Sequence, residues 1–150
     1  MISNSIPILY VEDDRAVRGL FSEELSDDGY DIIEPMLKPG NFSVDVDSML
    51  DGSSPKPALA IVDVRIMHGK TILWPPDIAF VTELTHNGIP AVITTADPDA
   101  HSILEEFGIR SFLKPINIRK EGEDSFVHAL KGARDDPETA VVDMSTLPYT

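Results

Sequence analysis

The sequence contains no cysteine. A disulfide framework, a thiolate zinc site and a cysteine nucleophile are therefore excluded. Histidine is also scarce, and the chain's four histidines are scattered without a pair at metal-ligand spacing. A metal centre in this protein would have to be built from oxygen ligands, which are the ligands of hard cations rather than of zinc.

Basic residues are few: 12 Lys and Arg stand against 26 Asp and Glu, for a net charge of -14. A phosphate backbone or an anionic lipid surface favours Lys and Arg, so we expect neither nucleic acid nor membrane as a partner. The negative charge is compatible with cation binding, and equally with plain solubility. Charge alone does not decide between these two interpretations.

Long apolar runs are missing too. None approaches the roughly 20 residues that a helix needs to span a bilayer. The first residues, "MISNSIPILY", lack the basic region and the extended apolar stretch of a signal peptide. We therefore expect a cytoplasmic protein, and 150 residues is the size of a single domain with a core of its own.

Short apolar runs alternate with amphipathic stretches along the chain. The apolar runs predict strands at 6–11, 30–33, 58–62, 91–95 and 110–113. The helical spacing of apolar residues predicts helices at 14–28, 41–50, 76–87, 98–107 and 118–134. Asp97 is the expected N-cap of its helix, and Gly29 and Gly108 are expected at C-terminal caps. This alternation predicts an α/β fold with a parallel sheet covered by helices on both faces.

Polar residues follow four of the predicted strands. The acidic run at 12–14 follows the first strand and Asp63 follows the third, while Thr95 ends the fourth and Lys114 follows the fifth. Ligands of open parallel sheets bind outside the carboxyl ends of the strands. We therefore expect these residues to gather at one edge of the sheet.

Neighbouring carboxylates about 4 Å apart repel by about 1 kcal/mol in water and about 4 kcal/mol at a protein-like dielectric. The helix dipole explains acids at a helix start when the run at 12–14 is taken alone. A divalent cation would offset the repulsion among the carboxylates of this run and Asp63. Hard oxygen ligands of this kind suit Mg²⁺ or Mn²⁺. Asp63 is then the best candidate nucleophile for a phosphoryl group, with Lys114 and the Thr95 hydroxyl positioned to pair with the phosphoryl oxygens.

Four motifs, "ILYVEDD", "ALAIVDV", "AVITTAD" and "FLKPI", occur in this order and together resemble the receiver domain of two-component response regulators over about residues 6 to 131. The resemblance implies a doubly wound, flavodoxin-like sheet of order 2-1-3-4-5. Carried over to this chain, the family's site residues are the acidic pair Glu12 and Asp13, the phosphoacceptor Asp63, a metal-binding carbonyl at Arg65, the switch hydroxyl Thr95 and the Lys114–Pro115 pair, whose bond is commonly cis.

The function that the resemblance implies is that of a single-domain response regulator. A sensor histidine kinase or a histidine phosphotransfer protein would phosphorylate Asp63 in the presence of Mg²⁺. Catalysis would be confined to the domain's own phosphotransfer and autodephosphorylation, so the protein is not expected to be an enzyme. Residues 1–134 are expected to form the receiver domain and 135–150 a loosely held acidic and polar tail. With no output domain expected, the signal would pass to an unknown output protein by direct contact.

The chain departs from the family pattern beside the site. Met67 lacks the usual following proline, so the loop after Asp63 is altered. The usual position of the aromatic switch residue holds Ser111, so either Phe112 serves as the switch or no aromatic residue does. Arg65 and Asp97 carry opposite charges on either side of the site, and we expect them to pair across it.

Two alternatives remain open at this stage. One is a degenerate receiver that acts as a phosphorylation-independent interaction module, which the altered loop and the missing aromatic would fit. The other is an aspartyl-phosphate hydrolase of the haloacid dehalogenase type. Those enzymes carry a second Asp two residues after the nucleophile, and Arg65 at that position speaks against this class.

Overall fold

The computed structural model describes residues 6–12, 15–33, 56–66, 73, 75–144 and 147. Its strands are β1 (Ile6–Val11), β2 (Tyr30–Ile33), β3 (Leu59–Asp63), β4 (Ala91–Thr95) and β5 (Ser111–Leu113). Its helices are α1 (Arg15–Asp27), α3 (Pro75–His86), α4 (Pro98–Glu106), α5 (Phe126–Asp135) and the short 3₁₀ helix η1 (Pro137–Ala140). The helix expected at 41–50 lies outside the described residues.

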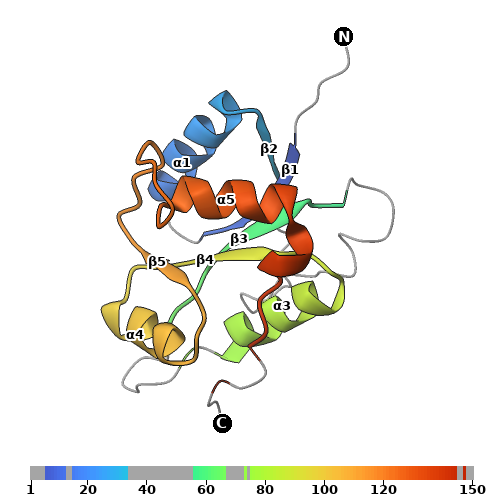
Figure 1. Cartoon of the computed structure of the whole chain (residues 1–150). Coiled ribbons are helices and arrows are strands. Elements are labelled where there is room, and N and C mark those ends of the chain that lie inside the picture. The colour runs from blue at the N-terminus through green and yellow to red at the C-terminus, as the bar shows by residue number, and fades with distance from the viewer. Residues whose placement is uncertain are drawn as a thin grey trace.

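The five strands form one sheet in the order β2-β1-β3-β4-β5, and every neighbouring pair is parallel. Helices α1 and α5 cover one face and helices α3 and α4 the other (Figure 1). The predicted doubly wound, flavodoxin-like fold is therefore confirmed. Within the described part of the chain, no helix has both the length and the apolar character needed to cross a membrane.

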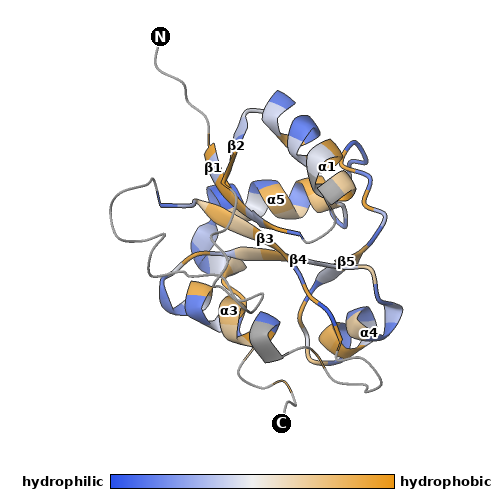
Figure 2. Cartoon of the chain, turned by 180° about the vertical axis from the view of Figure 1, so that it is seen from behind, coloured by the Kyte–Doolittle hydropathy of each residue, from blue (hydrophilic) through white to orange (hydrophobic). Residues whose placement is uncertain are grey.

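Side-chain alternation along the strands divides the core in two. In β1, Ile8 and Tyr10 pack with the α1 and α5 side chains, whereas Leu9 packs with those of α3 and α4. In β3, Ile61 and Val62 divide in the same way. Successive strand residues point to opposite faces, so a fully covered sheet must be apolar on both (Figure 2).

Local signals set the ends of α4 as predicted. The Asp97 carboxylate accepts a hydrogen bond of 2.9 Å from the backbone N–H of Asp99, and Pro98 occupies the first turn. Gly108 follows the helix with φ +75°, a conformation that residues with a Cβ rarely adopt. The predicted cap and stop signals of this helix are confirmed.

The last helix begins later than predicted. The expected span was 118–134, but α5 starts at Phe126 because Ser125 is its N-cap, accepting a hydrogen bond of 3.1 Å from the backbone N–H of His128. Gly122 has φ +126°, which a helix cannot include. The chain between β5 and α5 is therefore a loop, which begins at Lys114.

In the C-terminal segment, several of the residues that the structure describes are packed rather than loosely held, contrary to the expectation. Met144 and Leu147 are buried in the core between the sheet and α3. The Thr85 hydroxyl on α3 donates a hydrogen bond to the carbonyl of Val142. In Figure 1 the segment leaves α5 through η1 and runs beside α3. Its polar residues dominate its composition, but its apolar residues are enough to attach it to the sheet's α3 face.

Candidate phosphoacceptor site

The edge of the sheet carries a cluster of one ammonium and two carboxylates. Lys114 Nζ lies 3.1 Å from Asp63 Oδ1, and it donates a hydrogen bond to Glu12 Oε2. All three side chains are largely buried, with exposed fractions of 16% for Lys114, 9% for Asp63 and 1% for Glu12. The structure thus brings together three of the predicted site residues from the ends of three strands.

Strand register explains why these residues meet. In the pairing of β1 with β3, Val11 lies opposite Val62, so the next residues, Glu12 and Asp63, lie side by side at the edge of the sheet. On the other side, the backbone N–H of Lys114 donates a hydrogen bond of 2.8 Å to the carbonyl of Thr95. The Lys114–Pro115 peptide bond is cis. Parallel strands end at one edge, so residues far apart in sequence converge there.

Lys114 remains an ammonium in this environment. Burial alone would lower the pKa of its amine, but the hydrogen bond to Glu12 and the negative charge of Asp63 outweigh this effect, and its pKa is raised. A positive charge is therefore held beside Asp63 at neutral pH, where incoming phosphoryl oxygens would need it.

Thr95 is completely buried at the end of β4. Its hydroxyl accepts a hydrogen bond of 3.1 Å from the backbone N–H of Asp97 in the loop before α4. The neighbouring Thr94, rather than Thr95, lines the cavity that contains Asp63. The predicted hydroxyl thus lies at the expected edge but is engaged by the β4–α4 loop.

A cavity of about 710 Å³ opens over the cluster. Its polar side contains Glu12, Asp63 and Lys114, and its apolar side is formed largely by α1 and the residues after Lys114. On α1 the Leu20 side chain is 70% exposed although it is apolar. This volume is within the range of ligand pockets, and one apolar wall beside the acid cluster faces solvent.

The oxygen atoms at this edge suit Mg²⁺. Mg²⁺ takes one or two carboxylates, completes its coordination with carbonyls, waters and phosphate oxygens, and does not need nitrogen or sulfur ligands. Glu12 and Asp63 both bind Lys114 and supply two carboxylates, and Arg65, two residues after Asp63, lines the same cavity. Asp13 lies outside the described residues, and among the described residues no group of three Asp, Glu, His or Cys side chains is placed so that it could hold a metal ion. The described donors fit the ion without forming a complete cage.

The expected pair between Arg65 and Asp97 is not formed. Arg65 Nη2 lies 3.1 Å from Oδ1 of Asp77 on α3, and the Asp97 carboxylate instead caps α4. Sequence reasoning missed Asp77 because it stands 12 residues after Arg65, across a loop whose path the sequence does not reveal. The one available signal was an acid in the first turn of a predicted helix, which helix-dipole arguments already explain.

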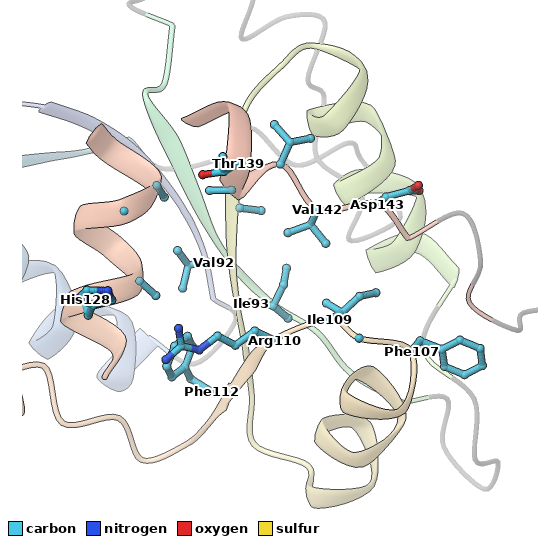
Figure 3. Close-up of a pocket in the computed structure, with 17 residues that line it drawn as sticks. Val92, Ile93, Phe107, Ile109, Arg110, Phe112, His128, Thr139, Val142 and Asp143 are labelled. Carbon is cyan, nitrogen blue, oxygen red and sulfur yellow. The ribbon is translucent and has the colours of Figure 1, made fainter. Parts of the chain in front are cut away.

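Phe112, the candidate aromatic switch, and Ser111, which holds the usual position of that switch, face opposite sides of the sheet. Phe112 packs edge-on against Phe126 of α5 with ring centroids 5.5 Å apart, and the Arg110 guanidinium lies 4.8 Å from the Phe112 ring. Figure 3 shows Arg110 and Phe112 together at one end of a cavity of about 500 Å³ between β4, α5 and the C-terminal segment. Ser111 faces α4, where a hydrogen bond of 2.6 Å joins it to His101 Nδ1. A hydroxyl therefore occupies the α4-facing position.

We expect a His101→Ala protein to lose about 1–2 kcal/mol of unfolding free energy. The substitution removes the bond to Ser111, whose hydroxyl is buried, and an unsatisfied buried polar group costs about that much. Urea unfolding measures the loss. Ser102→Ala, at an exposed position of the same helix, is the control and should leave the midpoint unchanged.

Neither a protein-family model nor a curated protein matches the sequence. Solved structures do match the fold. A response regulator receiver domain protein from Clostridium thermocellum superposes with a TM-score of 0.59 at 15% identity, over 89% of this chain and 98% of that one. The bacteriophytochrome response regulator AtBRR gives 0.54 at 14% identity, over 93% and 96%. The response regulator TrrA from Thermotoga maritima, in complex with Mg²⁺ and BeF, gives 0.50 at 20% identity, over 76% and 90%. The chain has the fold of a response regulator receiver domain.

Proposed function

We propose that this protein is a response regulator receiver that accepts a phosphoryl group on Asp63 and signals through protein contacts in the cytoplasm. The observation that carries the proposal is the buried cluster in which the Lys114 ammonium lies 3.1 Å from Asp63 and also binds Glu12. Helix capping explains none of these contacts, since they join the ends of three different strands.

The proposed transfer needs positioning and charge neutralisation more than covalent assistance. An Asp63 carboxylate oxygen attacks the phosphorus of a phosphohistidine, the P–N bond breaks, and its electron pair remains on the imidazole nitrogen. Lys114 exchanges part of its contact with Asp63 for the phosphoryl oxygens. When held by Glu12, Asp13, Asp63 and the Arg65 carbonyl, Mg²⁺ supplies further positive charge to those oxygens.

The proposed donor is a sensor histidine kinase or a phosphotransfer protein. The exposed Leu20 and Val17 on α1 support a protein donor, since they line the same cavity as Asp63. Exposed apolar side chains that border a polar site commonly mark a docking surface. A partner that buries them would bring its phosphohistidine over the acid cluster.

In the proposed output step, phosphorylation draws the Thr95 hydroxyl from the Asp97 N–H toward the phosphoryl group. The β4–α4 loop and the surface near β4 and β5 would repack with it. Such a step biases a two-state equilibrium that an output protein reads.

One observation favours a second candidate, a degenerate receiver that binds its partner without phosphorylation. The α4-facing position of β5 holds Ser111, bound to His101, where the family resemblance leads one to expect an aromatic switch. Beryllofluoride with Mg²⁺ separates the two candidates. A responsive receiver changes the fluorescence of its single tryptophan, and a degenerate one does not.

The decisive test is intact-mass measurement after incubation with acetyl phosphate and Mg²⁺. We expect one phosphoryl adduct on the wild-type protein and none on Asp63→Asn, because the amide is not a nucleophile for this transfer. Asp31→Asn, at an exposed position of β2, is the matched control and should keep the adduct. An adduct that survives in Asp63→Asn would show that the acceptor lies elsewhere.

A further inference from the structure

Asp77 on α3 binds Arg65, the residue two positions after the proposed phosphoacceptor Asp63. Its Oδ2 accepts a hydrogen bond of 3.0 Å from the backbone N–H of Arg65 and another of 3.3 Å from Arg65 Nε. Its Oδ1 accepts a third, of 3.1 Å, from Arg65 Nη2. One carboxylate therefore binds both the main chain and the side chain of a single residue.

This contact is well placed to be rigid. Asp77 has a side chain only 10% exposed, and it lies in the first turn of α3, where the helix dipole favours a carboxylate. A planar guanidinium binding both oxygens of a carboxylate has little freedom to rotate. An isolated antiparallel bridge joins Ile66, directly after Arg65, to Leu73, two residues before α3 begins. The backbone after β3 is thus attached once to α3, through Asp77, and once to the chain that leads into α3.

The hydrogen bond from the Arg65 backbone N–H to Asp77 matters because Arg65 lies beside the proposed Mg²⁺ site. Arg65 and Asp63 line the same cavity with Lys114, and the Arg65 carbonyl is one of the four proposed donors to Mg²⁺. Hydrogen bonds that orient a metal ligand commonly change metal affinity 10- to 100-fold when they are removed. The Arg65 side chain would otherwise carry a mobile positive charge beside a cation site, and Asp77 both fixes and neutralises it.

We propose that Asp77 is a positioning residue for the Mg²⁺ site, acting through the backbone of Arg65. This inference rests on the proposed function, because it concerns the same ion. It assigns to α3 a part in metal binding through a residue that contributes no ligand.

The test is Mg²⁺ binding to the full chain by titration calorimetry, without any phosphoryl donor. We expect Asp77→Ala to raise the Kd for Mg²⁺ 10- to 100-fold. Arg65→Ala keeps the backbone N–H that donates to Asp77, so its Kd should rise less than that of Asp77→Ala. Glu83→Ala removes the same charge from an exposed position of α3 and should leave the Kd unchanged.

The double variant Arg65→Ala/Asp77→Ala separates positioning from charge. If Asp77 positions the backbone, the double variant binds Mg²⁺ as weakly as Asp77→Ala. Recovery of wild-type affinity would mean that the guanidinium charge alone weakened binding, and this would overturn the inference. Hydrogen exchange adds a metal-free measurement: the amide of residue 65 should exchange faster in Asp77→Ala and remain protected in Arg65→Ala.

The two ways of failing are distinguishable. If the wild-type protein does not bind Mg²⁺, both the proposed function and this inference are contradicted. If the wild-type protein and Asp77→Ala bind Mg²⁺ equally well, only this inference is contradicted. If Asp77→Ala does not fold, the nearly isosteric Asp77→Leu serves in its place, since it has no acceptor for the Arg65 backbone N–H and the Kd should again rise 10- to 100-fold.

Discussion

A Lys114→Met protein should be less stable than wild type by about 3 kcal/mol in the absence of Mg²⁺. The substitution keeps an unbranched chain of similar length but removes the ammonium that binds Glu12 and Asp63. Both carboxylates are buried, so they lose a cation that water cannot replace, and losing one partner of a buried ion pair costs about 3–5 kcal/mol. Urea unfolding at neutral pH measures the difference.

Mg²⁺ should recover much of this loss, because the remaining carboxylates attract a cation more strongly once the ammonium is gone. A ligand at 100 times its Kd contributes about 2.7 kcal/mol to the stability of the state that it binds. Lys120→Met, at an exposed position of the same loop, is the matched control and should behave as wild type. A Lys114→Met protein with unchanged stability would contradict the ion cluster itself.

The pH dependence of this difference follows from the direction of the pKa shift. The pKa of Lys114 is raised above its ordinary value of 10.5 in the folded protein. The ammonium's contribution to stability is therefore complete below the unfolded pKa and is lost as the pH rises through the folded pKa. The difference in unfolding free energy between wild type and Lys114→Met should therefore be largest at neutral pH and should decrease only in alkaline buffer.

Met144→Ala should cost about 2–5 kcal/mol, the range for deleting a buried methionine from a packed core. Met144 is 1% exposed although it lies in the segment that the sequence predicts to be loosely held. Chemical unfolding measures the cost. Met144→Leu, which nearly conserves the volume, should cost less than about 1.5 kcal/mol.

Glu138→Ala, at an exposed position of η1, is the second comparison and should change stability little. A loosely held tail would instead tolerate Met144→Ala as well as it tolerates Glu138→Ala. Equal midpoints for these two variants would therefore show that Met144 does not contribute to the core in solution.

Local rules made much of the fold predictable. The cap of α4 depends on neighbours within two residues of Asp97, and β2 and β4 begin and end where their apolar runs do. The predicted start of α5 is wrong although its determinants are also local. The prediction joined Ile118 to the apolar residues after Ser125 across a polar stretch, and the positive φ of Gly122 is not visible in the sequence.

The sequence by itself determined that carboxylates, a hydroxyl and an amine end neighbouring strands, because a parallel sheet brings strand ends to one edge whatever the loops do. Only the tertiary structure decided the partner of Arg65, the faces taken by Ser111 and Phe112, and the burial of Met144. Each of these depends on how a loop returns to the sheet or on which face a short strand presents. A shift of one residue in the pairing register of a strand reverses the faces of its side chains, and residue types alone do not specify this register.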